Sequence, residues 1–278
     1  MNREEPGPDG TLIYLHIPKT AGRTFVKILR DQYGKARVYE AYSTPPDTLI
    51  DVYKALPVSE KTKYRAIAGH VAPDMHLSVP GPSLYVTMLR EPLRRALSTY
   101  QFIRRQQSHP AHAAVTENRM TLEQVMTSGV DPMLSNGHVR ALIGRHVPYG
   151  TNDRALLEEA IANLHERIGI FGLTERFDEA IMLMKRRFGW RGGFYSRRNS
   201  SPERLSVNDV PRSTIDAIRG YNALDFALYG YAAARVAESA RGQGLAFRSR
   251  VKVFSFLNGA RGRSHKLAAR VPLLARSR

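Results

Sequence analysis

The stretch LHIPKTAGRTF, residues 15–25, places a lysine, two threonines and a glycine between an apolar run and an amphipathic run. Lysine supplies a mobile positive charge, threonine hydroxyls supply donors, and glycine lets a ligand approach the backbone closely. Together these groups suit a phosphate anion. The order differs from a Walker A loop, in which the lysine follows the glycines. A plain strand-to-helix turn with a solvated lysine is the alternative for this stretch taken alone.

A second set of candidate residues follows the apolar run at 83–89. Arg90 comes directly after that run, and Ser98 lies about two turns into the helix expected beyond Pro92. A guanidinium offers a fork of donors that matches phosphate geometry, so Arg90 could hold a second phosphate. The alternatives are an ion pair with Glu91 for Arg90, and a small residue at a close helix contact for Ser98.

Two strands must position these residues. Residues 11–17 and 83–89 are short, rich in β-branched and aromatic residues, and bounded by turn residues, which predicts buried strands. Pro18 removes a backbone donor and should end the first strand. Apolar residues at helical spacing begin at Thr24 and again after Pro92. The unpaired N–H groups and the dipole at the start of a helix favour an anion.

His70 is the candidate general base. It follows a strand-like run at 64–68 and a glycine, so it should lie at the carboxyl end of a strand. An unperturbed imidazole titrates at about pH 6.5, so a neutral ring can accept a proton. The alternative is a ring hydrogen-bonded to the backbone. His16 is expected to be buried with its hydrogen bonds satisfied, and Glu91 to be an acid at a helix N-terminus.

Strands and helices alternate along the chain. Residues 168–173 form another strand candidate, and helical periodicity covers 113–127, 153–167, 174–188 and 211–237. This alternation predicts an α/β fold, with a central parallel sheet flanked by helices, a P-loop-like nucleotide-binding core and additional helices. In such sheets ligands bind beyond the carboxyl ends of the strands. Lys19 and Arg90 should therefore converge.

The two candidate motifs resemble the cofactor motifs of the sulfotransferases, in the branch that includes heparan sulfate 2-O-sulfotransferases and bacterial relatives. The residues that carry the likeness are HIPKTAG at 16–22 with Thr24, and LREP at 89–92 with Arg95, Ala96, Leu97, Ser98 and Tyr100. The segments FGLTERFD at 171–178 and NALDFALY at 222–229 are also similar to that branch. The resemblance implies the donor 3′-phosphoadenosine 5′-phosphosulfate (PAPS). It implies transfer of the sulfuryl group to a hydroxyl or amine of a saccharide, glycolipid or small-molecule acceptor.

The resemblance also implies roles for individual residues. Lys19 would meet the bridging oxygen and the leaving 5′-phosphate, and His70 would be the catalytic base. The 5′-phosphosulfate would be held by the loop residues Thr20, Ala21, Gly22, Arg23, Thr24 and Phe25. The 3′-phosphate would be bound by Arg90 and Ser98, and covered by a late basic loop that carries Arg197 and Arg198. A solvated surface loop is the alternative for that last pair.

One loop position departs from the family pattern, because Arg23 stands where the family usually has a small hydroxyl residue. The chemistry requires no metal, and the sequence offers no convincing metal cluster.

The chain of 278 residues has a formal net charge of +17, concentrated at its C-terminal end. Residues 241–278 contain ten lysines and arginines and no acidic residue, with apolar residues between them. The expected organisation is a flexible N-terminus at 1–10, a sulfotransferase α/β domain at 11–237 and a basic C-terminal tail at 238–278. The tail is interpreted as a segment bound to an anionic membrane surface or as an unstructured tail. Nucleic acid ranks last as a partner, since no nucleic-acid-binding motif accompanies the charge.

Cysteine is absent, residues 1–10 lack the apolar core of a signal peptide, and no run of about 18 apolar residues occurs. These features favour a cytoplasmic enzyme, with the inner membrane surface as a peripheral contact. Two other functions stay open. One is a P-loop-like nucleotide kinase, which needs a Walker lysine and a carboxylate for Mg²⁺; the other is a non-catalytic basic protein that binds a membrane or polyanion. The sequence predicts neither a single acceptor nor an oligomeric state.

Overall fold

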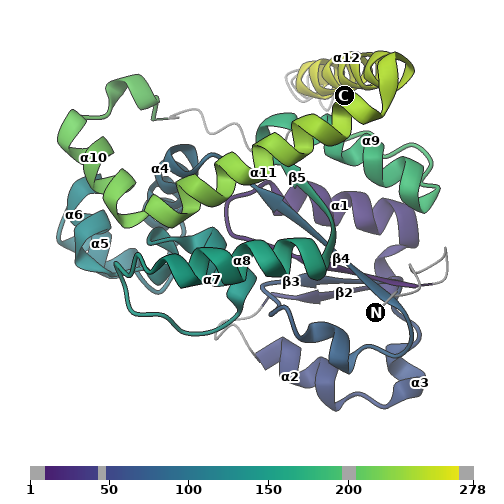
Figure 1. The fold of residues 1–278 in the computed structure, drawn as a ribbon, viewed down its shortest axis with the longest axis horizontal. Helices are drawn as coiled ribbons and strands as arrows, with labels where there is room; N and C mark the ends of the chain where they lie inside the picture. The colour runs from purple at the N-terminus through teal and green to yellow at the C-terminus, as the bar shows by residue number, and fades with distance from the viewer. Residues whose placement is uncertain (1–9, 43–47, 196–204, 269–278) are drawn as a thin grey trace, which may run out of the picture.

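A computed structural model of the chain describes residues 10–42, 48–195 and 205–268, with side chains up to residue 260. Five parallel strands form one sheet in the order β2-β3-β1-β4-β5 (Figure 1). Their bounds are Thr11–Leu15 (β1), Val38–Ala41 (β2), Ala66–Gly69 (β3), Ser83–Leu89 (β4) and Ile168–Leu173 (β5). The predicted α/β fold with a central parallel sheet flanked by helices is confirmed.

Alternate residues of β1 face two different cores, which is why the strand reads as a continuous apolar run. Leu12 and Tyr14 pack with residues of α1 (Gly22–Tyr33) and α9 (Phe177–Phe188). Ile13 and Leu15 pack with residues of α2, α7, α8 and α11 on the other face. The bounds of those helices are Thr48–Ala55 (α2), Gly137–Ile143 (α7), Arg154–Glu166 (α8) and Ala223–Gly242 (α11).

A third core lies in a helical lobe at one end of the molecule, at the left of Figure 1. It is built by α4 (Pro92–Arg105), α5 (His112–Glu117), α6 (Leu122–Ser128) and α10 (Arg212–Tyr221). Two further helices are the short α3 (Val58–Lys61) and the long α12 (Gly244–Ala268). Within the described residues, no helix combines the length and the apolar composition needed to cross a lipid bilayer.

The register of the sheet aligns three strand ends. Leu15 in β1 pairs with Gly69 in β3 on one side and with Thr87 in β4 on the other. The segments that follow these strands therefore leave the sheet at the same edge, with the loop after β1 in the middle. This edge carries Lys19, His70 and Arg90, as the alternation of strands and helices predicts.

Several element bounds differ from the predicted ones. β1 ends at Leu15, two residues before Ile17, and α1 begins at Gly22 rather than Thr24. The helix expected over 113–127 is interrupted, because Thr121 starts a new helix with a capping box to Gln124. The helix expected over 211–237 is likewise two helices that meet at Asn222.

Candidate functional site

The loop between β1 and α1 has the backbone form of an anion site. Lys19 and Ala21 both adopt left-handed conformations, with φ of 71° and 68°, which non-glycine residues rarely occupy and which cluster at functional sites. Ala21 occupies the N-cap of α1, where its methyl group accepts no hydrogen bond. The first N–H groups of α1 are thus left without a capping side chain, and successive N–H groups in such turns form concave anion sites.

Two loop residues serve the fold in ways that differ from the predicted ligand contacts. The side chain of Thr20 is fully buried and its hydroxyl donates to the carbonyl oxygen of Ile17 at 2.7 Å. This hydroxyl is therefore not directed at an anion in the loop, and only the backbone of Thr20 fits the predicted role. Gly22 packs against His16, and a Cβ there would lie 1.8 Å from Nε2 of that ring. Position 22 must therefore be a glycine, because any side chain there would collide with the His16 ring.

The remaining loop residues lie at the start of α1. Arg23 is exposed, Thr24 is half-buried and Phe25 is buried in the core between α1 and the sheet. The N–H groups of Thr24 and Phe25 both donate to the carbonyl oxygen of Ala21, at 3.0 and 3.2 Å. The N–H groups that fit an anion are thus those that precede Thr24.

The Lys19 side chain reaches across to α4, where its Nζ lies 4.0 Å from the centroid of the Phe102 ring. Burial, together with the nearby positive charges of Arg105, Arg90 and Arg23, lowers the pKa of Lys19 to about 8. A cation in such surroundings gains most from an anionic ligand, because the ligand relieves repulsion among several positive groups at once.

Arg90 joins the end of β4 to this loop. One terminal nitrogen of its guanidinium, Nη1, donates to the backbone carbonyl oxygen of Lys19 at 3.0 Å. The predicted convergence of the two strand ends is therefore present. Ser98 is half-buried on α4, and Glu91 caps that helix by accepting hydrogen bonds from the N–H groups of Leu93 and Arg94, as predicted for an acid at a helix N-terminus.

Arg197 and Arg198, the predicted residues of the late basic loop, lie outside the described residues. Tyr195, just before them, is described: its N–H donates to Oδ1 of Asn258 in α12 at 3.1 Å. Trp190 packs against Phe188 and donates from its indole nitrogen to the Tyr33 hydroxyl.

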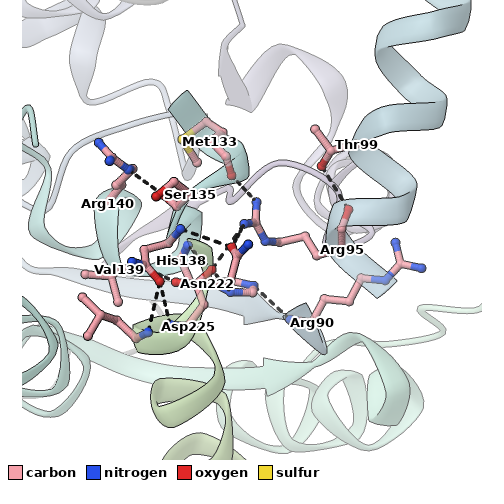
Figure 2. Close-up of polar contacts among 12 residues, drawn as sticks. Arg90, Arg95, Thr99, Met133, Ser135, His138, Val139, Arg140, Asn222 and Asp225 are labelled. Carbon is pink, nitrogen blue, oxygen red and sulfur yellow. Dashed lines mark hydrogen bonds and ion pairs between the residues drawn. The ribbon is translucent and has the colours of Figure 1, made fainter. Parts of the chain in front are cut away.

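Behind Arg90 lies a buried polar network that Figure 2 shows in close-up. The Arg90 N–H donates to Nε2 of His138 at 3.2 Å, and Nδ1 of His138 lies 2.9 Å from Oδ2 of Asp225. Since Nε2 accepts, the proton of a neutral imidazole must sit on Nδ1. Burial lowers the pKa of His138 and outweighs the attraction of Asp225, which agrees with a neutral ring.

Asp225 is the centre of this network and has no exposed surface. It also accepts from the N–H groups of His138 and Val139, each at 3.0 Å, and from Nη2 of Arg95 at 3.3 Å. Burial alone would raise the pKa of Asp225, but these donors and the Arg95 charge outweigh it, and the pKa falls to about 2. Arg95 and Asp225 are therefore a buried ion pair.

The same network ties the helical lobe to the sheet edge. Arg95 in α4 also donates to the carbonyl oxygen of Met133 at 2.8 Å and to Oδ1 of Asn222 at 3.3 Å, where α10 meets α11 (Figure 2). A Cβ at Gly137 would lie 2.6 Å from Nη1 of Arg95, so glycine is needed there. Arg140 donates to the carbonyl oxygens of Ser135, Val147 and Pro148 and so fixes the loop after α7.

His70 stands on the other side of the loop, directly after β3. Its Nδ1 lies 2.8 Å from the carbonyl oxygen of His16. A carbonyl can only accept, so Nδ1 carries the hydrogen and Nε2 keeps a lone pair that can accept a proton. The ring is exposed but stacks on His16 and meets Tyr42 edge-on. Desolvation by these neighbours lowers the pKa of His70, against the smaller raising effect of the His16 carbonyl.

His16 differs from its prediction. Its ring is only half-buried as a whole, and its Nδ1 is buried without a hydrogen-bond partner among the described residues. Tyr14 and His70 stack on the ring, and Gly22 lies against its Nε2 edge. Burial lowers the pKa of His16 well below the usual value, and the charge of His70, when that ring is protonated, and the charge of Lys19 lower it further. The ring is therefore neutral beside His70.

Comparison with known proteins agrees with this geometry. A family model described as galactose-3-O-sulfotransferase matches residues 2–247. Galactose-3-O-sulfotransferase 3 of Bos taurus is 27% identical over 164 residues, which are 55% of this chain and 38% of that protein. The proteins of the same name from Mus musculus and Homo sapiens are 26% and 25% identical, each over 55% of this chain and 37% of the relative.

The match to these relatives thus spans little more than a third of their length. The family model, in contrast, covers both strand ends, the helical lobe and the buried network. The sulfotransferase assignment made from the two motifs is confirmed, and the chain belongs to the galactose-3-O-sulfotransferase family.

Proposed function

We propose that this protein transfers the sulfuryl group of PAPS to a hydroxyl group of a saccharide. The observation that carries the proposal is the hydrogen bond from Arg90 to the carbonyl oxygen of Lys19. It joins two cationic strand ends into a single site, as a nucleotide with phosphates at both its 3′ and 5′ positions requires. The family match supports the same chemistry.

The proposed donor supplies a sulfuryl group attached to the 5′-phosphate and a separate 3′-phosphate. The chain's groups fit it: the open N–H groups at the start of α1 and the Lys19 ammonium suit the 5′ end, and Arg90 with Ser98 suits the 3′-phosphate. Lys19 offsets the negative charge that grows on the 5′-phosphate as its bond to sulfur breaks. The pre-set loop also holds the reacting groups in line.

His70 is proposed to take the proton. Its Nε2 has a lone pair because Nδ1 is committed to the His16 carbonyl oxygen. As the acceptor oxygen forms its bond to sulfur, the hydroxyl proton passes to Nε2 and the sulfur–oxygen bond to the 5′-phosphate breaks. The lowered pKa keeps His70 neutral at neutral pH and so ready to accept.

We propose that the acceptor is a galactose residue, which reacts at its 3-hydroxyl. The names of the relatives specify this position for those proteins, and the exposed setting of His70 is compatible with a saccharide that reaches the site from solvent. An amine, a glycolipid or a small alcohol is the alternative that the assay must separate from it.

The experiment incubates the full chain with ³⁵S-labelled PAPS and a panel of acceptors: a β-galactoside, the same galactoside methylated at the 3-hydroxyl, a glucoside, a glycolipid without galactose, an amino sugar and a small alcohol. Label on the first alone supports the proposal. Thermal shifts with 3′-phosphoadenosine 5′-phosphate, ATP with Mg²⁺, and heparin run in parallel. Stabilisation by ATP with Mg²⁺ but not by the 3′-phosphorylated nucleotide would point to a kinase, and stabilisation by heparin alone to a polyanion-binding protein.

A further inference from the structure

Helix α12 is docked on the body of the protein by one face. Phe247 and Phe254 are buried, with 6% and 4% of their surface exposed. Ser255 donates to Oδ2 of Asp178 at 2.6 Å, and the Asn258 amide donates to Oδ1 of the same carboxylate at 3.1 Å. Asp178 lies in the first turn of α9, so α12 has a fixed orientation at the edge of the molecule (Figure 1).

Helix α12 also presents large apolar side chains to solvent. The exposed fractions are 79% for Leu245, 59% for Val253, 68% for Phe256 and 42% for Leu257. These are four of the eight large apolar side chains that are exposed in the described part of the chain. Their concentration on one helix indicates a surface with a binding role rather than scattered exposure.

The spacing of these residues follows helical geometry. At about 100° per residue, Phe256 lies about 200° around the helix from the buried Phe254, and Leu245 lies within about 20° of Phe256. Leu245, Val253 and Phe256 therefore form a stripe on the side away from the core. A helix with two apolar faces, one docked and one outward, has a second surface to cover.

Helix α12 also carries exposed positive charge. Arg248, Arg250 and Lys252 are all exposed on α12. Residues 241–278 contain no acidic residue that could pair with them. An ordinary solvated helix mixes both signs of charge. A helix with apolar residues flanked only by cations matches the composition of helices that lie in the plane of a membrane surface.

We propose that the outward face of α12 docks on an anionic lipid bilayer. Leu245, Val253 and Phe256 enter the boundary between headgroups and acyl chains, and the basic residues contact lipid phosphates. A second copy of the chain fits less well, because like-charged faces would meet. A nucleic acid would match the cations but leave Phe256 and Leu245 in water. The proposal does not depend on the sulfotransferase activity.

The test is flotation of the full chain with vesicles of phosphatidylcholine alone and of phosphatidylcholine mixed with phosphatidylglycerol. Two variants each place one carboxylate on an exposed apolar position: Phe256→Asp on α12 and Val58→Asp on α3, where Val58 is 63% exposed. The anionic vesicles should bind the wild type and Val58→Asp alike. Binding of Phe256→Asp should fall by about tenfold or more, since an inserted aromatic ring is lost.

A fluorescence readout detects insertion directly. Trp190 is the single tryptophan and is 7% exposed, so it gives a constant background. In Phe256→Trp, emission should shift to shorter wavelength on addition of the anionic vesicles, and it should stay unchanged in phosphatidylcholine alone.

Four results would overturn the proposal. They are no binding to anionic vesicles, equal loss of binding in both Asp variants, no spectral shift for Phe256→Trp, and RNA binding as tight as vesicle binding. A dimer seen by light scattering that only Phe256→Asp disrupts, without vesicle binding, would assign the face to a second copy. Because both substituted residues are exposed, melting curves of the two Asp variants should match and exclude unfolding as the cause.

Discussion

The backbone N–H of Arg90 is held by Nε2 of His138 at 3.2 Å, while Nδ1 of the same ring faces Asp225. Figure 2 shows that the imidazole bridges the end of β4 and the start of α11. His138 is fully buried, so we expect it to position Arg90 without contacting the proposed nucleotide. Two substitutions of His138 can test its bonds to Arg90 and Asp225 separately. The amide of a glutamine reaches the position of Nε2, which faces Arg90, and the amide of an asparagine reaches that of Nδ1, which faces Asp225.

We expect His138→Asn to weaken binding of 3′-phosphoadenosine 5′-phosphate by about fivefold, the value of one hydrogen bond. His138→Gln, which retains an acceptor for Arg90, should bind it nearly as tightly as the wild type. Isothermal titration calorimetry measures both. Equal affinities in the two variants would show that His138 does not act through Arg90.

We predict that Arg90 contributes more to nucleotide affinity than His138 does. Arg90→Ala should raise the dissociation constant for 3′-phosphoadenosine 5′-phosphate by about 10- to 100-fold, since hydrogen bonds to charged groups are stronger than neutral ones. The matched control is Arg94→Ala, which removes an exposed arginine from the first turn of α4, just after Arg90. A similar loss of nucleotide affinity in both variants would show that the effect comes from net charge and not from a specific contact of Arg90.

Lys19 is predicted to act on the rate. Lys19→Met keeps an apolar stem beside Phe102 but removes the charge, and kcat should fall by about 100-fold or more, as when one preorganised donor is removed from a transition state. Lys27→Met is the control, because Lys27 pairs with Asp31 on the outer side of α1. Transfer of ³⁵S from PAPS is the measurement, and near-normal turnover in Lys19→Met would remove this residue from the mechanism.

The pH dependence of kcat/KM should be bell-shaped. His70 must be neutral, and its pKa is lowered from 6.5, so the acid limb should lie below pH 6.5. Lys19 must be charged, and its pKa is about 8, so activity should decline as pH rises through about 8. His70→Asn should lose rate and the acid limb while nucleotide affinity stays the same. An acid limb that persists in this variant would place the base elsewhere.

The Arg95–Asp225 pair should dominate local stability. Asp225→Ala leaves Arg95 buried without its counter-charge, and the free energy of unfolding should fall by about 3–5 kcal/mol. In the wild type, the pKa of Asp225 falls from 3.8 to about 2 on folding. The stabilisation is therefore complete above pH 3.8 and is lost as pH falls through about 2. Urea denaturation tests this, with the exposed Asp31→Asn as control.

Much of the fold follows from short apolar runs with clear ends. β1, β4 and β5 are such runs, and the segments that follow β1, β3 and β4 supply Lys19, His70 and Arg90. β2 was not predicted, because VYEA at 38–41 is brief and carries Glu40, which pairs with Arg30 on α1. The break at Asn222 was hidden because helical spacing continues across it.

Other features depend on contacts that no sequence pattern encodes. The partner of the Thr20 hydroxyl, the approach of His16 to Gly22 and the ring beside Lys19 on α4 all come from packing. His138 had no supporting context in the sequence, since Asp225 lies 87 residues further along the chain. Buried polar groups find their hydrogen-bond partners only in the assembled fold. A network such as that of His138 and Asp225 can therefore be recognised only once the distant helices are known to meet.

Because β1 lies between β3 and β4, acceptor binding and nucleotide binding in the proposed enzyme fall on opposite sides of the Lys19 loop. His70 extends one flank of the Lys19 loop and Arg90 the other, so the reacting alcohol and the adenosine would arrive from opposite directions. Selectivity for one sugar over another would then depend mainly on residues of the β3 side. We therefore expect substitutions on the β3 side to change the preferred alcohol and to leave the affinity for the nucleotide unchanged.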